Sequence, residues 1–447
     1  MKNVKIKLSA THLILLSFLA AILTGSILLS LPISSASGEA VKYIDALFTA
    51  TTATCVTGLV TVTTATAWSV FGQVVILILI QIGGLGIITV LSGVMIVARK
   101  KIGLNGRILI QDSFNLGDLS GIVKFVKKVV KGTFIVETAG ALLYMIVFVP
   151  QFGIKGVWMS VFNSVSAFCN AGMDVISTDS LCSYYSNFIV NFVTMSLVIL
   201  GGIGFIVWWD VIRIVKEKKK FSHLRLHSKI AIVTTLVLVF SGAAAFFVFE
   251  YNNPLTMKYF SLWDKIQNSL FQSVTMRTAG FVSIPQEHLT NASNIAALLL
   301  MFIGGSPVGT AGGVKTVTVA VLLMVAVASA KEKKDVSMFN RNISAFAVKR
   351  AVAVTMISFL TVFLSALLLS AAENAPIDTI LYECVSAAAT VGASKGFTSS
   401  LGVLGKLIII LTMYFGRVGP ITLFIAFSRK SASENIIKNP TEEISVG

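Results

Sequence analysis

Long apolar runs, separated by short polar segments, dominate the hydrophobic pattern of this chain. A helix of about 20 apolar residues can cross a hydrocarbon core of about 30 Å. Four runs of this length alternate with four further long runs. The first set spans residues 12–31, 130–149, 230–249 and 349–371, and the second set spans residues 70–98, 188–214, 295–330 and 404–427. The pattern therefore predicts an all-α polytopic membrane protein with eight transmembrane helices.

A shorter apolar segment lies between the two long runs of each pair. These segments are too short to cross the membrane and fit re-entrant helices. They span residues 44–54, 157–168, 262–276 and 377–388. Each carries an apolar anchor ten residues before a glycine, and three carry an acid near the start, where the helix dipole favours a carboxylate. The anchors are Phe48, Phe162, Leu270 and Tyr382, and the acids are Asp45, Asp264 and Asp378.

Each short segment ends in an apolar turn with a glycine. These glycines, Gly58, Gly172, Gly280 and Gly392, recur at intervals of 108 to 114 residues. Such regular spacing indicates four copies of one unit, made of a helix, a short helix, a turn and a second helix. We assign the repeats to residues 1–100, 101–215, 216–335 and 336–430, with a cytoplasmic tail at 431–447.

The four glycine turns are candidates for the lining of an ion pathway around a central pore. A half helix that dips into the bilayer points its C-terminal carbonyls, the negative end of its dipole, at the membrane centre. Glycine takes positive φ without penalty, so the backbone can aim carbonyl oxygens at one axis and replace the hydration shell of an alkali cation. Plain extracellular turns are the alternative, which four copies in register disfavour. The candidate filter residues are Val56, Thr57, Gly58, Asn170, Ala171, Gly172, Thr278, Ala279, Gly280, Thr390, Val391 and Gly392.

A second glycine element follows each turn glycine after 24 to 29 residues. It begins at residues 83, 201, 304 and 416 and reads GGLG, GGIG, GGSP and GRVG. Small residues let helix backbones approach closely in lipid, which explains the first two copies. The third and fourth copies depart from this pattern.

In the third repeat the element extends to five glycines and a proline within residues 304–313. Proline removes a backbone donor and each glycine costs about 1 kcal/mol, so the helix must break here. We predict a flexible intramembrane loop between two half helices. A phosphate-binding loop is rejected because Lys315 does not directly follow a glycine and no strand precedes it. The predicted gate consists of Gly304, Gly305, Gly309, Gly312 and Gly313, together with Arg417.

Arg417 replaces the second glycine of the fourth copy, about ten residues from either helix end. A guanidinium at that depth is expensive and indicates a functional residue, with a structural bond to neighbouring carbonyls as the alternative. It follows Gly392 by nearly the same interval that separates the loop from Gly280, so both should lie just below the filter. For Glu137, at mid-depth in the second repeat, packing or hydrogen bonding is favoured over ion conduction.

Composition and charge support the membrane interpretation. The chain is 55% hydrophobic and 13% charged, with a mean hydropathy of +0.86. Most of its 36 Lys and Arg residues fall in five segments of one topological class, which the positive-inside rule places in the cytoplasm together with both termini. The net charge of +16 therefore reflects topology and not a nucleic-acid partner. The N-terminal run is also similar to a signal peptide, but cleavage would remove the first helix of repeat one.

Two other function classes fit the sequence less well. An enzyme would need a constellation of His, Asp, Glu or Cys, whereas the four histidines lie at membrane edges or in loops. The four cysteines, Cys55, Cys169, Cys182 and Cys384, lack metal-ligand spacing and are interpreted as unpaired thiols. A secondary transporter of a small organic substrate usually needs polar or charged side chains at the midplane, whereas here the converging groups are mostly backbone.

The fourfold plan, the four glycine turns, the glycine-rich third repeat and the Gly-Arg-Val-Gly-Pro run resemble the Trk/Ktr/HKT potassium transporter superfamily. The closest likeness is to the KtrB membrane subunits of bacterial Ktr potassium uptake systems, over nearly the whole chain. It implies potassium as the transported ion, a filter with one glycine per repeat, an intramembrane gating loop and a location in the bacterial cell membrane. Met173 stands where the family commonly has phenylalanine, which affects packing but not the backbone carbonyls.

The resemblance also implies partners. It indicates a homodimer on a cytosolic nucleotide-binding ring of the KtrA type, with ATP or ADP bound to that partner and no cofactor in this chain. Family members often need or respond to sodium. The basic segment 213–229 offers a docking surface for the ring, although its charge is equally explained by topology.

Overall fold

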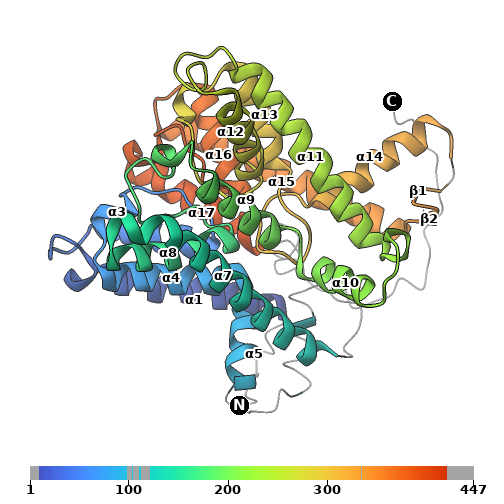
Figure 1. Ribbon diagram of the computed structural model, residues 1–447, viewed down its shortest axis with the longest axis horizontal. Helices are drawn as coiled ribbons and strands as arrows, with labels where there is room; N and C mark the ends of the chain where they lie inside the picture. The colour runs from blue at the N-terminus through green and yellow to red at the C-terminus, as the bar shows by residue number, and fades with distance from the viewer. Residues whose placement is uncertain (1–9, 98–102, 104–109, 112–120, 334, 420–447) are drawn as a thin grey trace, which may run out of the picture.

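The computed structural model describes residues 10–97, 103, 110, 111, 121–333 and 335–419. In this part of the chain almost every regular element is a helix, apart from one antiparallel pair of two-residue strands (Figure 1). The predicted cytoplasmic tail at 431–447 lies outside the described residues. In chain order the elements are α1 (Ala10–Leu29), α2 (Tyr43–Cys55), α3 (Thr64–Ala67), α4 (Val70–Leu85), α5 (Ile87–Val97), α7 (Ile122–Phe152), α8 (Ile154–Cys169), α9 (Phe188–Gly202), α10 (Phe205–Lys216), α11 (Leu226–Glu250), α12 (Leu262–Thr275), α13 (Asn291–Phe302), α14 (Thr316–Ala330), β1 (Ser337–Met338), β2 (Arg341–Asn342), α15 (Ala345–Ala372), α16 (Ile377–Ala389) and α17 (Val403–Val418).

Four helices, α1, α7, α11 and α15, are each long and apolar enough to cross a membrane. They correspond to the first set of long apolar runs. Most of their surface faces outward: in α15 only 17% of the most apolar window is buried. Exposed phenylalanines and leucines on a long helix need an apolar surrounding, and the membrane supplies one.

The second set of long runs does not form continuous helices. Continuity was expected for the first and second of these runs, and there the expectation was wrong, whereas the break in the third run was predicted and is confirmed. Glycines at positive φ interrupt three of them: Gly86 (φ 82°) separates α4 from α5, Gly204 (φ 95°) separates α9 from α10, and Gly419 (φ 93°) ends α17. A right-handed helix cannot continue through such a residue. The angle between α9 and α10 is 98°. The predicted continuation of α17 to residue 427 lies outside the described residues.

The third of these runs is interrupted differently. The helix stops at Phe302 and resumes at Thr316, and the glycine-rich stretch between them is non-helical. All four second runs therefore change direction or end at their glycine element. Counted by length and composition, the described residues hold four candidate spans, or five if the bent pair of α9 and α10 is one span.

Four short helices, α2, α8, α12 and α16, correspond to the predicted re-entrant segments. Each packs against the second helix of the preceding unit: α4 contacts α8, α9 contacts α12, α13 contacts α16, and α17 returns to contact α2. These contacts form a closed cycle. α17 also contacts α1, and Figure 1 shows α17 near the helices of the first unit.

The predicted anchors of the short helices are buried at Phe48, Phe162 and Tyr382, but not in the third helix. There Leu270 is only partly buried, and Phe271 (1% exposed) fills the core position. The assignment of Leu270 was therefore wrong by one residue. The reason is the end of the helix: α2, α8 and α16 run directly into a left-handed residue, whereas α12 ends at Thr275 and is followed by Met276 in the right-handed region. The left-handed residue follows the buried anchor by eight positions in the other three repeats but by only seven here, from Phe271 to Thr278.

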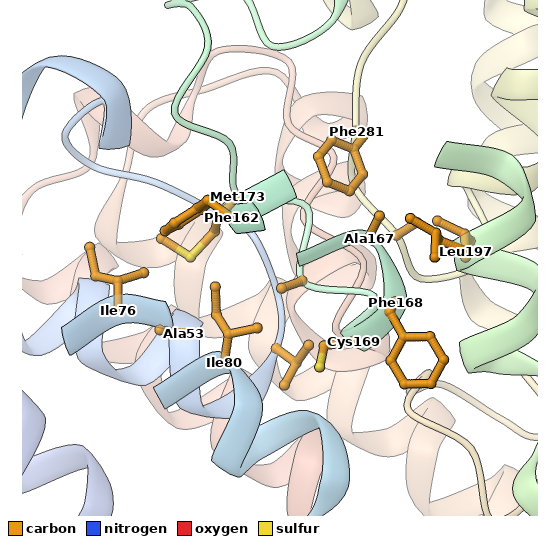
Figure 2. Close-up of a cluster of buried hydrophobic side chains, with 14 of the residues drawn as sticks. Ala53, Ile76, Ile80, Phe162, Ala167, Phe168, Cys169, Met173, Leu197 and Phe281 are labelled. Atoms are coloured by element: carbon orange, nitrogen blue, oxygen red, sulfur yellow. The ribbon is translucent and has the colours of Figure 1, made fainter. Parts of the chain in front are cut away.

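The largest hydrophobic cluster surrounds the second short helix (Figure 2). Met173, directly after the second turn glycine, packs there close to Phe162. Ile76 and Ile80 of α4 close the cluster from the other side. The methionine thus fills the space behind its turn with a flexible apolar side chain, and the short helix is fixed against α4.

Candidate ion pathway

The four turn glycines meet in a closed ring, here called the glycine ring. A Cβ added to Gly58 would lie within 3.0 Å of the carbonyl oxygen of Ala171, next to Gly172. The other three glycines make the corresponding contact, each with the carbonyl oxygen of the residue before the next turn glycine. A Cβ at Gly172 would meet the Ala279 oxygen, one at Gly280 the Val391 oxygen, and one at Gly392 the Thr57 oxygen. Each glycine therefore lies against the carbonyl that precedes the next ring glycine, and no other residue fits.

The backbone of the four turns follows one pattern. The residue two positions before each ring glycine has positive φ, and so has the glycine itself. The former residues are Val56, Asn170, Thr278 and Thr390, with φ between 52° and 66°. Left-handed conformation costs a non-glycine residue roughly 1–2 kcal/mol. The surrounding structure imposes this conformation in all four turns, which is typical of a functional constraint. All twelve predicted filter residues lie in these turns.

Hydroxyl groups near the end of the short helices hold the turns in place. In the first and fourth turns a side chain accepts the ring glycine's N–H: Gly58 N to Thr52 Oγ1 (2.9 Å) and Gly392 N to Ser386 Oγ (3.1 Å). In the other two the hydroxyl donates to the carbonyl after the glycine: Ser166 to Met173 (2.5 Å) and Thr275 to Phe281 (2.6 Å).

These four hydroxyl residues were not predicted. Three lie six residues before their ring glycine, and Thr275 lies five before Gly280, in step with the shifted anchor Phe271. Alignment of the four turns on their glycines reveals this recurrence. Such bonds fix the direction of the carbonyls without placing a side chain in the pathway.

A cavity of about 510 Å³ opens on one side of the glycine ring, and all four ring glycines line it. Its wall includes the acidic residues Asp174, Asp179 and Glu287. A concave surface lined by one sign of charge raises the local concentration of ions of the opposite sign. The cavity is therefore suited to collect cations above the ring.

The glycine-rich loop of the third unit, residues 303–315, lies on the other side of the ring. It contacts residues that precede the ring glycines, whereas the cavity is lined by residues that follow them. The base of the loop is closed by bonds from Gly304 N to Val314 O and from Val314 N to Phe302 O, both 3.0 Å long. The middle of the loop reaches the second turn, where Thr310 Oγ1 is 2.8 Å from Asn170 Oδ1.

All five predicted gate glycines lie in this loop, in contact with neighbouring backbone or turns. A Cβ at Gly304 or Gly313 would collide with the opposite side of the loop base, and one at Gly305 or Gly309 with carbonyls at the end of α9. One at Gly312 would collide with Thr390 of the fourth turn. The loop thus spans the space between the second and fourth turns, which lie opposite each other in the glycine ring.

Arg417 is brought to this loop, as the intervals along the sequence predict. Its guanidinium donates to the carbonyl oxygens of Thr310 (2.5 Å), Gly83 (2.5 Å) and Gly84 (3.3 Å). The Thr310 carbonyl belongs to the loop, and the other two belong to the last turn of α4. Arg417 therefore joins α17, α4 and the loop through neutral carbonyls.

Two further cations bind loop carbonyls. Lys315 Nζ donates to Ala311 O (2.6 Å), within the loop itself. Arg277, three residues before Gly280, places a guanidinium nitrogen 3.4 Å from Gly304 O. The role of these two residues was not fixed by the sequence.

Glu137 does not lie on this pathway. Its carboxylate accepts a hydrogen bond from Gln81 Nε2 (3.2 Å), and its carbonyl accepts one from Ser164 Oγ (2.6 Å). It thereby links α7 to α4 and α8, which agrees with a hydrogen-bonding role.

A second buried carboxylate, Glu383 of α16, was overlooked. It accepts hydrogen bonds from Thr398 and from Ser394 Oγ (2.9 Å), both in the segment after the fourth ring glycine. A second acid, in the interior of the short segment that carries Asp378 near its start, was the available signal. Glu383 fixes the chain where it leaves the ring.

The chemistry of the site is that of backbone oxygen. Within the described residues, no three His, Cys, Asp or Glu side chains gather as a metal-binding group. The groups that converge at the ring are carbonyls and small apolar or hydroxyl side chains. Such a set suits an alkali cation that sheds its water, because hard cations prefer oxygen ligands.

Comparisons with known proteins point to transport. The family model TrkH, described as cation transport protein, matches residues 6–439. The potassium/sodium uptake protein NtpJ of Enterococcus hirae is 40% identical, and the alignment covers 100% of this chain and 99% of that protein. The Ktr system potassium uptake protein B of Bacillus subtilis is 38% identical, with 99% and 98% covered. The crystal structure of the potassium transporter TrkH from Vibrio parahaemolyticus has the same fold, with a TM-score of 0.77 at 16% identity, covering 96% of this chain and 86% of that one.

Proposed function

Because this chain belongs to the TrkH family of cation transport proteins, we propose that it is the potassium-selective, ion-translocating subunit of a bacterial potassium uptake system. The family consists of cation transporters and not enzymes. The observation that carries the proposal is the glycine ring, in which every glycine lies against the carbonyl before the next one.

The proposed architecture is a set of four tandem repeats, each a spanning helix, a re-entrant short helix, a glycine turn and a second, interrupted spanning helix. The boundaries are 1–100, 101–215, 216–335 and 336–430. The cyclic packing of α4 on α8, α9 on α12, α13 on α16 and α17 on α2 supports this arrangement. In the cell membrane it amounts to eight crossings with both termini in the cytoplasm.

Selectivity arises at the carbonyl oxygens of the four turns. They replace the hydration shell of potassium as it passes the ring, and the number and field strength of the carbonyl dipoles favour potassium over sodium. The acidic cavity above the ring supplies cations, and the negative ends of the short-helix dipoles stabilise the dehydrated ion.

The loop at 303–315 gates the pathway. Its contacts with Arg417, with the end of α9 and with the second and fourth turns hold it below the ring in the closed state. Three basic side chains, Arg417, Lys315 and Arg277, lie in or against the loop, and their positive charge repels an entering cation. Displacement of α14 would pull the loop away from the ring.

A cytosolic partner controls this movement. One relative is named as a protein of a Ktr system, and the resemblance described above implies a homodimer on a KtrA-like ring that binds ATP or ADP. The basic segment at 213–229 is the candidate docking surface. Sodium dependence is part of the proposal, because one relative is named a potassium/sodium uptake protein.

The test is ion flux in vesicles that contain the purified chain. The proposal predicts uptake of potassium and rubidium down their gradients, with sodium much slower, and no transport of small organic solutes. Vesicles without protein are the control. If the vesicles exchange an organic solute and show no potassium flux, the proposal is wrong and the protein is a secondary transporter.

A further inference from the structure

We propose that Thr310, a residue of the loop and not of the filter, determines ion selectivity by positioning the second turn of the glycine ring. This inference deepens the proposed function and rests on it. It makes the loop a support of the filter as well as a barrier below it.

The Thr310 side chain is fully buried and directed at the second turn. Its hydroxyl lies 2.8 Å from Asn170 Oδ1 and 3.1 Å from the carbonyl oxygen of Phe168. Phe168 is in the last turn of α8, where helix carbonyls have no intrahelical partner. Asn170 is the left-handed residue that starts the turn. The single proton of this hydroxyl is thus shared between two acceptor oxygens, one at the end of the short helix and one, the nearer, on the residue that starts the turn.

The backbone of Thr310 is fixed as firmly as its side chain. Its N–H donates to Gly201 O (3.1 Å), and its carbonyl accepts the guanidinium of Arg417 (2.5 Å). Gly201 belongs to α9 and Arg417 to α17, so Thr310 is held from both sides. Its hydroxyl therefore has a defined position only while the loop is in place.

The second turn has a particular need for this support. Asn170 has positive φ, and its Nδ2 is buried with no partner among the described residues. Its immediate neighbour Ala171 contributes the carbonyl that lies against Gly58 in the ring. A rotation of Asn170 would therefore move a ring carbonyl directly.

The loop also supplies a matched control. Thr316 is another fully buried threonine of the same segment, and its hydroxyl is 2.8 Å from Ser306 Oγ, within the loop region. No contact joins that hydroxyl to a turn in the described structure. Loss of either hydroxyl weakens the loop, but only loss of the Thr310 hydroxyl removes a contact with the filter.

The experiment compares Thr310→Val, Thr310→Ser and Thr316→Val in vesicles by the ratio of potassium to sodium flux. A neutral hydrogen bond contributes about 1 kcal/mol, which corresponds to about a fivefold change. We expect Thr310→Val to lower the ratio about fivefold, and Thr310→Ser and Thr316→Val to keep it within twofold of the wild type. Asn170→Gly tolerates positive φ and removes the partner of the Thr310 hydroxyl from the filter side. It should lower the flux ratio to a similar extent, and combining it with Thr310→Val should lower the ratio little further.

A Thr310→Val protein with wild-type selectivity and normal or increased flux would overturn the inference, and so would an equal loss in Thr316→Val. If Thr310→Val does not fold, Asn170→Gly decides: an unchanged ratio in that variant also overturns it. Failure of the proposed function looks different, because the wild-type protein itself would then show no potassium selectivity.

Discussion

The glycine ring and the loop below it are both glycine-rich and non-helical, yet they are held in different ways. Each ring glycine lies against backbone of the next turn, and the contacts repeat around a cycle. The loop is held by a small number of hydrogen bonds: backbone bonds join it to the junction of α9 and α10, and side-chain bonds join it to Arg417 and Asn170. A ring fixed by backbone contacts can keep a precise spacing of carbonyls, whereas a loop fixed by a few hydrogen bonds can be released.

The largest effect is expected from the ring glycines. Replacement of any one of the four by serine places a Cβ within 3.0 Å of a backbone oxygen, which cannot yield as a flexible side chain can. The ratio of potassium to sodium flux should fall at least about tenfold, since about 1.4 kcal/mol of differential binding suffices for that change. Uptake by potassium-starved cells that lack their own uptake systems measures it.

Gly38 is the matched control, because it also has positive φ (76°) but a Cβ there would meet nothing within 4 Å. Gly38→Ser should leave selectivity unchanged. A wild-type ratio of potassium to sodium flux in all four ring variants would show that the ring is not the filter.

The next largest effect is expected from shortening the loop. Deletion of residues 308–311 removes Thr310 and with it the contacts to Arg417, Gly201 and Asn170. Potassium flux should rise on the order of tenfold and depend less on the cytosolic partner, because several hydrogen bonds of about 1 kcal/mol each no longer favour the closed state. Tracer flux with and without the partner measures both changes. Deletion of the exposed residues 37–40 is the control. If both deletions change potassium flux and its dependence on the partner equally, the loop is not the gate.

A smaller effect is expected from Arg417→Gln. The variant loses the positive charge and most of the three carbonyl contacts, but the loop keeps its bonds to α9. Flux should rise about threefold, less than the deletion, since only part of the closing energy is lost. Lys155→Gln, which neutralises an exposed cation, should change nothing. Reduced flux in a correctly folded Arg417→Gln protein would show that the arginine supports the structure of the pathway and does not hold the gate closed.

The smallest effect on transport is expected at the outer ends of the short helices, where ion pairs fix the scaffold of the ring. Lys406 lies 2.7 Å from Asp45, and both side chains are largely buried (14% and 9% exposed). Lys406→Met leaves this carboxylate without its cation and should lower stability by about 2 kcal/mol. Lys395→Met breaks a pair of equal length with Asp378, which is 58% exposed, and should cost about 1 kcal/mol or less. Thermal unfolding in detergent compares the stability of the two variants. A larger loss of stability in Lys395→Met than in Lys406→Met would contradict the argument that the more buried ion pair matters more.

The sequence was most informative where one residue type is required by local geometry. The four ring glycines recur in register, and the structure brings them together. The interval argument for Arg417 also led to the correct neighbour, because helix length sets depth. In these cases the pattern along the chain and the position in space are directly connected.

The failures have a common physical cause. Gly86 and Gly204 were interpreted as packing residues in continuous helices, because a glycine at a helix contact and one that ends a helix look alike in sequence. Leu270 was chosen over Phe271 because the sequence does not show that the third repeat has one residue fewer than the others between its buried anchor and its left-handed residue. Thr310 was not singled out, since its significance lies in a contact with Asn170, 140 residues away.

The central claim is that a dehydrated potassium ion passes through the carbonyl oxygens of the glycine ring. Anomalous scattering from crystals grown with rubidium or thallium tests this most directly, because both ions substitute for potassium and can be located. The account predicts a peak on the axis of the ring, beside the carbonyls of Thr57, Ala171, Ala279 and Val391, that weakens when sodium replaces the heavy ion. A peak elsewhere in the protein with none at the ring would contradict it.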